Sequence, residues 1–312
     1  MRRAGLGCVL LLAACAPGAA SGSGATQRNA ASPTESTFHG PGGTLAYEVR
    51  GTSTGRPLVL INGGPGFDHT QLLVVPGAWD RLGQNRPLVF YDQRGTGHSF
   101  ALKPGASDTL EDQVSDLEAL RVHLGAETLD LLGHSSGGSI AIAYASRHPA
   151  QVAHLVLVDS QPPKPADLRD LLGEVFPDIL ERQRSLDAAR KRGDPDAVAE
   201  SRRLRRMMLF YSPETRDLYL TGAKQLPFST QVNALLSEDI ERRDFTADVK
   251  TFRMPVLVVT GRFDLVVPTA TAFATQRQIP GSVLATFERS GHLPFVEEPE
   301  AFAREVESFL AK

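Results

Sequence analysis

The chain has 312 residues, of which 41% are hydrophobic and 22% are charged, and its formal net charge is −3. This composition is typical of a soluble protein with one large domain or two small ones. So small a net charge gives no reason to expect binding to nucleic acid or to an anionic membrane surface. No apolar run of the sequence reaches the length of a membrane-spanning helix.

Residues 1–15 have the pattern of a bacterial lipoprotein signal peptide. Two arginines precede a short apolar stretch, and Leu12-Ala13-Ala14-Cys15 resembles the lipobox, in which the cysteine is lipidated. The alternative is a plain secretory signal with a cysteine nearby. We therefore expect export to the bacterial cell envelope, with a lipid anchor at Cys15 that makes the membrane a partner of the protein.

Residues 16–37 predict a flexible tether, because they are rich in alanine, glycine, serine and threonine and show no hydrophobic periodicity. The only cysteines of the chain are Cys8 and Cys15. The part that follows the tether therefore has no disulfide, no thiolate metal ligand and no cysteine nucleophile.

Residues 38–160 alternate strand patterns with helix patterns, and the alternation returns over residues 251–312. Strands are predicted where apolar residues run together or alternate with polar ones, and helices where apolar residues recur with helical spacing. Thr109 and Asp112 resemble a capping box at the start of one helix. The predicted strands are residues 44–50, 58–61, 88–91, 129–132, 155–158, 256–259 and 283–287, and the predicted helices are residues 109–124, 140–146, 271–278 and 299–310. This order predicts an α/β fold with a mostly parallel central sheet and helices on both faces.

Residues 161–250 interrupt that alternation. They lack apolar strand runs and are rich in charge of both signs. Four prolines separate their amphipathic stretches, namely Pro177, Pro195, Pro213 and Pro227. The segment is therefore predicted to be an inserted helical cap over the carboxyl ends of the strands, where open α/β sheets bind ligands.

The sequence Gly133-His134-Ser135-Ser136-Gly137 lies between a predicted strand and a predicted helix. A G-x-S-x-G in that context is typical of a nucleophile elbow, a tight turn whose flanking positions favour glycine because a Cβ would clash. Such a turn would hold the Ser135 hydroxyl at the edge of the sheet, within reach of a substrate carbonyl. Because the pattern also occurs by chance, its weight depends on whether partner residues follow in the right order.

A serine nucleophile needs a base that takes its proton and an acid that orients the base. In the α/β-hydrolase arrangement the acid and then the histidine follow the serine along the chain. Asp264 lies just past the predicted strand at 256–259, and His292 is the histidine that follows both serine and acid. Asp159, which follows the predicted strand at 155–158, is a rival for the acid.

Two backbone N–H groups are expected to bind the oxyanion. One belongs to Ser136, directly after the nucleophile. The other belongs to the glycine-rich loop at residues 62–66, where Gly64 is the preferred donor. This chemistry requires no metal and no organic cofactor, and none is expected.

Together these segments resemble the proline iminopeptidase family of α/β-hydrolases over about residues 44–310. The matching motifs are NGGPG at 62–66, DQRGTGHS at 92–99, GHSSG at 133–137, GRFDLVVP at 261–268 and SGHLPF at 290–295. Asn62 departs from the histidine of the family, and Ser136 departs from a tryptophan that helps to shape the prolyl pocket. We expect residues 92–94 to brace the oxyanion loop through a buried polar network.

The resemblance implies a serine hydrolase that forms an acyl-enzyme and releases N-terminal residues, with proline preferred, from short peptides. Enzymes of this family hold the free amino group of the substrate with cap glutamates, for which Glu214, Glu238 and Glu241 are available here. The departure at Ser136 leaves open a carboxylesterase, lactonase or amidase that acts on small esters or amides. A lipid-anchored binding protein that has lost catalysis is a further alternative.

Overall fold

The computed structural model describes residues 34–75, 77–169 and 171–312. The predicted signal peptide with Cys15, and residues 16–33 of the predicted tether, lie outside these residues. Within the described ranges, no helix combines the length and the apolar character that a membrane span requires.

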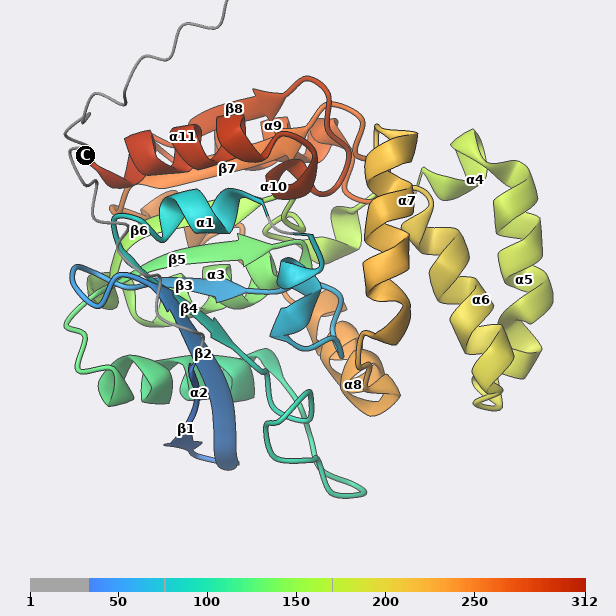
Figure 1. Ribbon diagram of the computed structural model, residues 1–312, viewed down its shortest axis with the longest axis horizontal. Helices are drawn as coiled ribbons and strands as arrows, with labels where there is room; N and C mark the ends of the chain where they lie inside the picture. Colours follow the sequence, from blue (N-terminus) through green and yellow to red (C-terminus); the bar gives the residue numbers. More distant parts are fainter. Residues whose placement is uncertain (1–33, 76, 170) are drawn as a thin grey trace, which may run out of the picture.

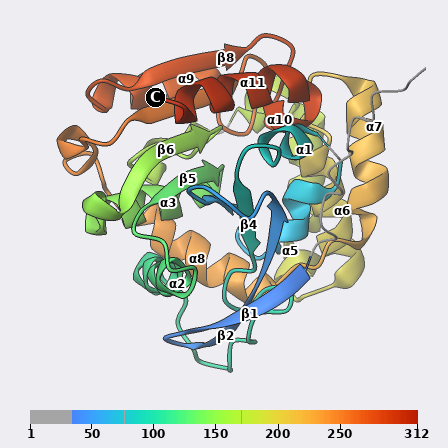
Figure 2. The same ribbon diagram turned by 60° about the vertical axis from the view of Figure 1, so that its left-hand side comes forward.

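An eight-stranded sheet forms the centre of the described chain (Figures 1 and 2). Its spatial order is β1-β2-β4-β3-β5-β6-β7-β8. The six strands from β4 to β8 in this order pair in parallel, whereas β1 and β2 are antiparallel to their neighbours. The strands are β1 (Thr34–Gly40), β2 (Gly43–Gly51), β3 (Leu58–Ile61), β4 (Pro87–Tyr91), β5 (Leu129–His134), β6 (Val152–Val158), β7 (Val256–Gly261) and β8 (Val283–Phe287). The predicted α/β fold with a mostly parallel sheet is confirmed.

Helices bury both faces of the sheet, because successive side chains of a strand point to opposite sides. In β3, Leu58 and Leu60 belong to one apolar core, whereas Val59 and Ile61 belong to the other. The first core is covered by α1 (Ala78–Leu82), α10 (Pro294–Glu297) and α11 (Pro299–Leu310), and the second by α2 (Leu110–His123), α3 (Ser136–Arg147) and α9 (Thr269–Gln278).

Between β6 and β7 the chain forms helices that lie to the right of the sheet in Figure 1. They are α4 (Leu172–Val175), α5 (Pro177–Lys191), α6 (Pro195–Arg206), α7 (Pro213–Gly222) and α8 (Thr230–Glu241). Three of them begin with a proline. Proline is favoured there because it has no N–H, and the N–H groups of the first turn have no partner within the helix. Phe228 pairs with Phe67, so this segment contacts the loop that follows β3 at the carboxyl edge of the sheet.

The boundary of the predicted tether at residue 37 needs correction, because residues 34–37 belong to β1. The strand pairs with β2 from Thr34 opposite Val49 to Gly40 opposite Gly43. Its sequence, TESTFHG, resembles a linker because Phe38 is its only buried apolar side chain. An edge strand can form from backbone pairing and one buried side chain. The composition of residues 34–37 therefore did not distinguish a strand from a linker.

Candidate active site

Ser135 lies in the sharp turn that joins β5 to α3. Its backbone has φ 55° and ψ −122°, in the left-handed half of conformational space that side chains with a Cβ rarely adopt. The turn is so tight that a Cβ at Gly133 would lie 2.6 Å from the carbonyl oxygen of Gly137, and a Cβ at Gly137 would clash with the carbonyl oxygen of Ile61. The glycines of the pentapeptide are thus required by close backbone approach, and the turn holds Ser135 under strain.

The glycine-rich loop after β3 lies against this turn. A Cβ at Gly63 would lie 2.6 Å from the Ser135 Cβ, and Gly64 has φ 62°. The N–H of Gly64 donates no hydrogen bond to the described residues. Ser136 is the first residue of α3, a position whose N–H has no partner within the helix. Two unused N–H donors therefore flank Ser135, which is what an oxyanion hole requires.

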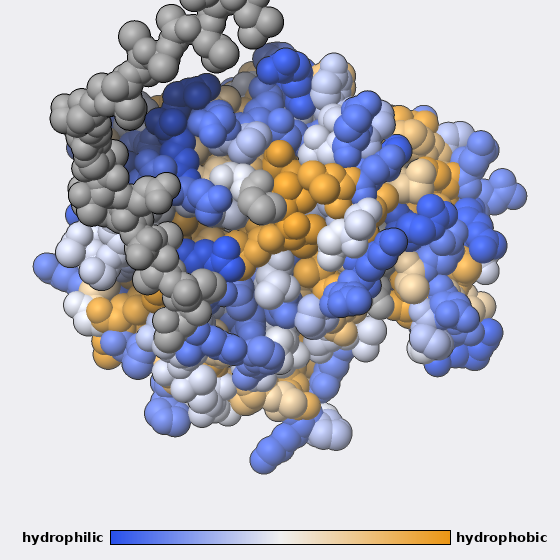
Figure 3. Space-filling model, viewed as in Figure 1, coloured by the Kyte–Doolittle hydropathy of each residue, from blue (hydrophilic) through white to orange (hydrophobic). Residues whose placement is uncertain are grey.

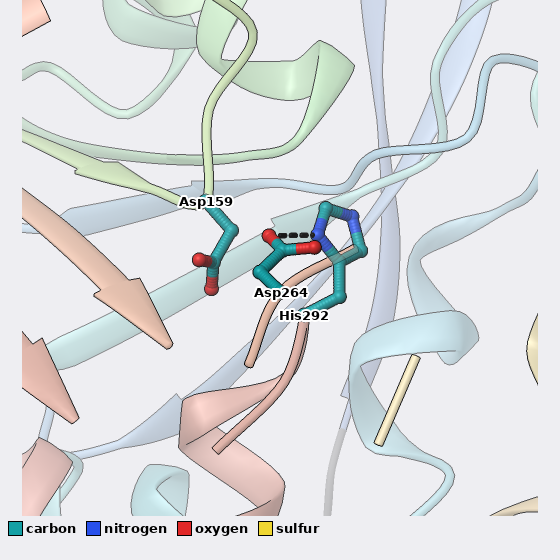
Figure 4. Close-up of side chains that lie close together, drawn as sticks. All are labelled: Asp159, Asp264 and His292. Atoms are coloured by element: carbon teal, nitrogen blue, oxygen red, sulfur yellow. Dashed lines mark hydrogen bonds and ion pairs between the residues drawn. The ribbon is translucent and has the colours of Figure 1, made fainter. Parts of the chain in front are cut away.

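Asp264 and His292 form a buried pair in the loops after β7 and β8. His292 Nδ1 lies 2.7 Å from Asp264 Oδ2, and the two residues are 4% and 3% exposed (Figure 4). Asp264 Oδ1 accepts hydrogen bonds from the N–H groups of Val266 at 2.8 Å and Val267 at 2.9 Å. These three donors hold the carboxylate in one orientation.

His292 lies beside the strained turn through His134, the residue before Ser135. The Nε2 atom of His134 donates a hydrogen bond to the backbone oxygen of His292 at 2.9 Å, and the two rings are 4.8 Å apart. The described residues form no hydrogen bond between Ser135 Oγ and His292. Such bonds are often long in unliganded enzymes and shorten when substrate binds.

A third buried acid, Asp159, lies next to this pair, directly after β6. One ligand atom each of Asp159, Asp264 and His292 falls within 4.8 Å of the others, a spacing that would also suit a metal ion. In this structure the Nδ1 atom of His292 is hydrogen-bonded to Asp264, so this nitrogen is already occupied. Asp159 is therefore a neighbour of the acid at position 264 and not a substitute for it.

Residues 92–94 form the polar network behind the oxyanion loop. Gln93 Nε2 donates to the backbone oxygen of Asn62 at 3.0 Å, and Asn62 Nδ2 donates to the backbone oxygen of Phe67 at 3.0 Å. Arg94 forms a two-pronged ion pair with Asp116 of α2, through Nε at 2.7 Å and Nη2 at 2.8 Å. The loop that bears Gly64 is thus tied through Gln93 to a buried support on α2.

Replacing Gln93 with leucine is expected to lower kcat about 10-fold with little change in KM, because it frees the loop that presents Gly64. A matched control is Gln113→Leu, which removes another buried amide, bonded to Asp108 at 2.9 Å, away from the loop. Steady-state kinetics and thermal unfolding of both variants make the comparison. Equal losses of kcat in the two variants would contradict a specific role for Gln93.

The three predicted cap glutamates lie on the surface of the helical segment between β6 and β7. Glu214, Glu238 and Glu241 are all exposed. Glu214 accepts a hydrogen bond from Ser212, and Glu238 pairs with Arg242 one helical turn away. In α8 the buried face is formed by residues 232, 236 and 240, so positions 238 and 241 fall outside it. No contact between these glutamates and Ser135 is seen among the described residues, so their role in substrate binding stays a prediction.

The acid that joins the helical segment to the histidine loop is Glu297, which the sequence patterns did not single out. Its Oε2 accepts from the N–H of Gly291 at 2.6 Å, and its Oε1 accepts from the N–H groups of Tyr211 at 2.9 Å and Ser212 at 2.8 Å. Burial raises the pKa of the Glu297 carboxyl, while these three N–H donors act against that rise. Its only signal in the sequence is its position five residues after His292.

His134 makes the stability of this region depend on pH. Complete burial, together with neighbouring His292, lowers the pKa of His134 to about 3, so the ring is neutral in the folded protein. The unfolded chain has an ordinary value of about 6.5, so below this pH it binds a proton that the folded state excludes. Stability is therefore fully present above pH ~6.5 and is lost as the pH falls toward 3.

We expect His134→Gln to remove this sensitivity, since the amide can keep the hydrogen bond to the backbone oxygen of His292. Between pH 7.5 and 5, wild type should lose about 2 kcal/mol more unfolding free energy than the variant. Urea unfolding at the two pH values measures the difference. Parallel losses in both proteins would show that His134 does not carry it.

Comparison with known proteins first identifies the class of protein to which the chain belongs. A family model described as the alpha/beta hydrolase fold matches residues 56–299, which is most of the chain. A structure of an alpha/beta fold family hydrolase from Bacillus anthracis superposes with a TM-score of 0.73 at 22% identity, covering 89% of this chain and 99% of that one. The chain is thus an α/β hydrolase, and its site residues make it a serine hydrolase.

The nearer relatives are more specific. A proline iminopeptidase of Clostridium botulinum is 30% identical over 288 residues, covering 85% of this chain and 94% of the relative. A proline iminopeptidase of Saccharolobus solfataricus is 29% identical, with 85% and 87% covered. The chain therefore belongs to the proline iminopeptidase family of α/β hydrolases. A thermophilic esterase from Thermogutta terrifontis, solved with malate bound, is similar at 26% identity and a TM-score of 0.68, covering 90% of this chain and 98% of that one.

Proposed function

We propose that this hydrolase is an aminopeptidase that releases N-terminal residues, proline among them, from short peptides through an acyl-enzyme formed on Ser135. The observation that carries the proposal is the buried Asp264–His292 pair beside a serine held at φ 55°. The likeness to proline iminopeptidases supports the substrate class.

In the proposed mechanism, His292 removes the hydroxyl proton of Ser135 while Asp264 stabilises the imidazolium. Ser135 Oγ attacks the carbonyl carbon of the scissile bond, and the N–H groups of Gly64 and Ser136 bind the oxygen that becomes negative. His292 then gives its proton to the leaving amine. Water, activated by His292, releases the acyl group and restores the free serine.

The second candidate is a carboxylesterase, lactonase or amidase for small substrates. It is favoured by Ser136, which takes the place of a pocket-forming tryptophan, and by the similar Thermogutta esterase. A binding protein without activity would have little use for a strained serine beside a buried base.

A direct comparison of hydrolysis rates tests the proposal. Purified protein is given prolyl-, alanyl- and acetyl-arylamides and a p-nitrophenyl ester, with Ser135→Ala as the blank. The proposal expects turnover of arylamides that carry a free N-terminal amine, and slower turnover of the acetylated one. Hydrolysis of esters alone would contradict the peptidase assignment while leaving the serine chemistry in place.

We further propose that residues 161–250 act as a cap over the site and that Cys15 carries a lipid anchor in the cell envelope. The contacts of Phe228 with Phe67 and of Glu297 with the backbone at 211–212 support the cap. The lipobox-like tetrapeptide ending at Cys15 supports the anchor. In the expressing bacterium, Cys15→Ser should move the protein from the membrane fraction to the soluble fraction. Unchanged membrane association would contradict lipidation.

A further inference from the structure

Two buried carboxyl groups, Asp159 and Asp264, lie side by side at the ends of the adjacent strands β6 and β7 (Figure 4). Asp159 is 1% exposed and has φ 43°, which makes it, with Ser135, one of two described residues other than glycine with a positive φ. Its N–H donates to the backbone oxygen of Val259 at 2.9 Å. One carboxyl oxygen of Asp159 lies within 4.8 Å of one of Asp264, the acid that orients His292.

The hydrogen bonds of the two groups show which one keeps a proton. Asp264 accepts three hydrogen bonds, from His292 and from the N–H groups of residues 266 and 267. Asp159 accepts one, at Oδ1 from the N–H of Gly261 at 2.9 Å, while its Oδ2 is fully buried and receives no donor. Two carboxyl groups within 4.8 Å of each other in a buried site are not both charged, and the charge stays where the donors are.

We propose that Asp159 is a positioning residue that remains protonated and donates a hydrogen bond from its carboxyl group to Asp264. This bond accounts for the buried Oδ2 atom and gives the Asp264 carboxylate a fourth donor, which keeps its other oxygen turned toward His292. Burial, the charge of Asp264 and a side-chain hydrogen bond with it all raise the pKa of Asp159 well above its ordinary range.

The titratable groups near Asp159 are few. Asp264 faces it from the loop after β7, His292 lies behind Asp264, and His134 of β5 packs on His292. The neighbouring Thr260 is uncharged, and its hydroxyl donates to the backbone oxygen of Gly261 at 3.3 Å. Any change in the charge of Asp159 should therefore be felt first at Asp264 and then in the acid limb of the pH profile, which reports His292.

The test compares Asp159→Asn, Asp159→Val and, as a control, Asp80→Asn on the exposed surface of α1. Asparagine keeps a neutral donor, so we expect kcat within about 2-fold of wild type and an unchanged acid limb of kcat/KM. Valine removes the donor, so we expect kcat to fall about 10-fold and the acid-limb pKa to rise by about half a unit to one unit. If Asp159 were charged, asparagine would instead lower that pKa by about one unit, and this outcome would overturn the proposal.

The kinetic part of this proposal rests on the proposed function. Two further measurements, thermal stability against pH and infrared spectroscopy, do not depend on activity and test the protonation of Asp159 separately. The folded state holds the Asp159 proton more tightly than the unfolded chain, so wild type should lose stability as the pH rises above ~4. The Tm advantage of Asp159→Asn over wild type should therefore grow from pH 5 to pH 8. The infrared C=O band of protonated carboxyls at pH 7 should be weaker by one group in Asp159→Asn than in wild type and Asp80→Asn. Asp108, whose pKa burial raises to about 7, contributes to the band in all three. Identical bands in all three would also overturn the proposal.

A separate observation concerns Arg206, at the end of α6. Its guanidinium lies 5.4 Å over the ring of Phe67, and its Nη1 donates to the backbone oxygen of Ala223 at 2.9 Å. Burial lowers its pKa, and no carboxylate among the described residues pairs with it. By contrast, the exposed Arg203 on the same helix pairs with Glu200 at 2.7 Å. A half-buried arginine without an anion is unusual, because the charge is desolvated without compensation.

Arg206 lies close to the catalytic loops on two sides. The Phe67 ring beneath it packs on Gly64, where a Cβ would approach the ring to 2.8 Å. Three residues after Arg206, the backbone oxygen of Leu209 accepts the N–H of His292 at 2.7 Å. The cation without an anion thus lies over the ring that packs on the oxyanion loop, and the chain that follows it contacts the histidine loop.

We infer that Arg206 binds a carboxylate of the substrate. If the proposed peptidase function holds, this is the C-terminal carboxylate of a very short peptide. Wild type should then cleave prolyl-alanine with a kcat/KM about 10- to 100-fold above that for its C-terminal amide. Arg206→Gln should remove most of this preference by raising KM for the free acid, whereas the exposed Arg205→Gln should keep it.

Equal losses on acid and amide in Arg206→Gln would show that the arginine only fastens α6 to Phe67, and would overturn the inference. If no peptide is cleaved, the same comparison uses a p-nitrophenyl monoester of succinate and the corresponding ester without a free carboxylate. A preference for the charged ester that Arg206→Gln abolishes would support the carboxylate site even though the peptidase proposal had failed. The absence of a preference in both series contradicts the site.

Discussion

Replacing Ser135 with alanine should lower kcat about a million-fold, because it removes the only oxygen that forms the acyl-enzyme. The substitution keeps a Cβ at φ 55°, so the strain of the turn and the unfolding free energy should change by less than ~0.5 kcal/mol. Hydrolysis of the best arylamide or ester and labelling by a fluorophosphonate probe measure the effect. Wild type should be labelled at Ser135, and the variant should not be labelled.

The matched control is Ser115→Ala on the exposed side of α2, where the hydroxyl only bonds the backbone oxygen of Glu111. It should retain full activity and full labelling. A second variant, Ser135→Gly, should be inactive yet more stable than Ser135→Ala, since glycine adopts a positive φ without steric cost. Folded wild type that does not react with the probe, or hydrolysis that survives in Ser135→Ala, would refute the serine mechanism.

Asp264→Asn is expected to lower kcat about 10⁴-fold through the tautomer of His292. The N–H groups of Val266 and Val267 require an oxygen at the Oδ1 position, so the amide nitrogen must take the Oδ2 position and donate to His292 Nδ1. The proton of the ring is then forced onto Nε2, and that nitrogen can no longer accept the proton of Ser135. The side chain stays nearly the same shape, so the loss falls on kcat and not on folding.

Steady-state kinetics of Asp264→Asn and of the surface control Asp80→Asn measure this loss. The Tm of each variant is measured as well, to show that both are folded under the assay conditions. A loss smaller than ~10-fold would show that Asp264 does not orient the base. In that case Asp159, the other buried acid, would have taken over, and the double variant Asp159→Asn/Asp264→Asn should then lose the remaining activity. Additive small losses would exclude both acids.

The strands of the sheet could be predicted well, because β3, β4, β6 and β7 each contain four consecutive apolar residues. The predicted segment 58–61 coincides with β3 and 283–287 with β8, and 88–91 and 256–259 fall within β4 and β7. β6 ends where predicted but starts earlier, because its pairing with β5 begins at Val152, three residues before the apolar run at Leu155. The edge strand β1 escaped prediction because its partner supplies backbone bonds that leave no apolar pattern in the sequence.

The site could be predicted only where the chemistry imposes an order along the chain. Ser135, Asp264 and His292 follow such an order, and they lie at the carboxyl ends of β5, β7 and β8. Asp159 could be considered only as a competing acid, because nothing in the sequence shows that β6 and β7 are neighbours. Glu297 contacts backbone groups and Arg206 contacts an aromatic ring, all from segments distant in the sequence. Such contacts produce no sequence motif.

The hydrogen bond between His134 and His292 spans 158 residues of chain and depends on the last strand and the last helices. Contacts of such long range form late in folding, because the chain must first close a large loop. A growing or partly folded chain therefore already contains the serine but has no base beside it. Hydrolytic activity should arise only at the end of synthesis and maturation, which makes the appearance of turnover a direct measure of complete folding.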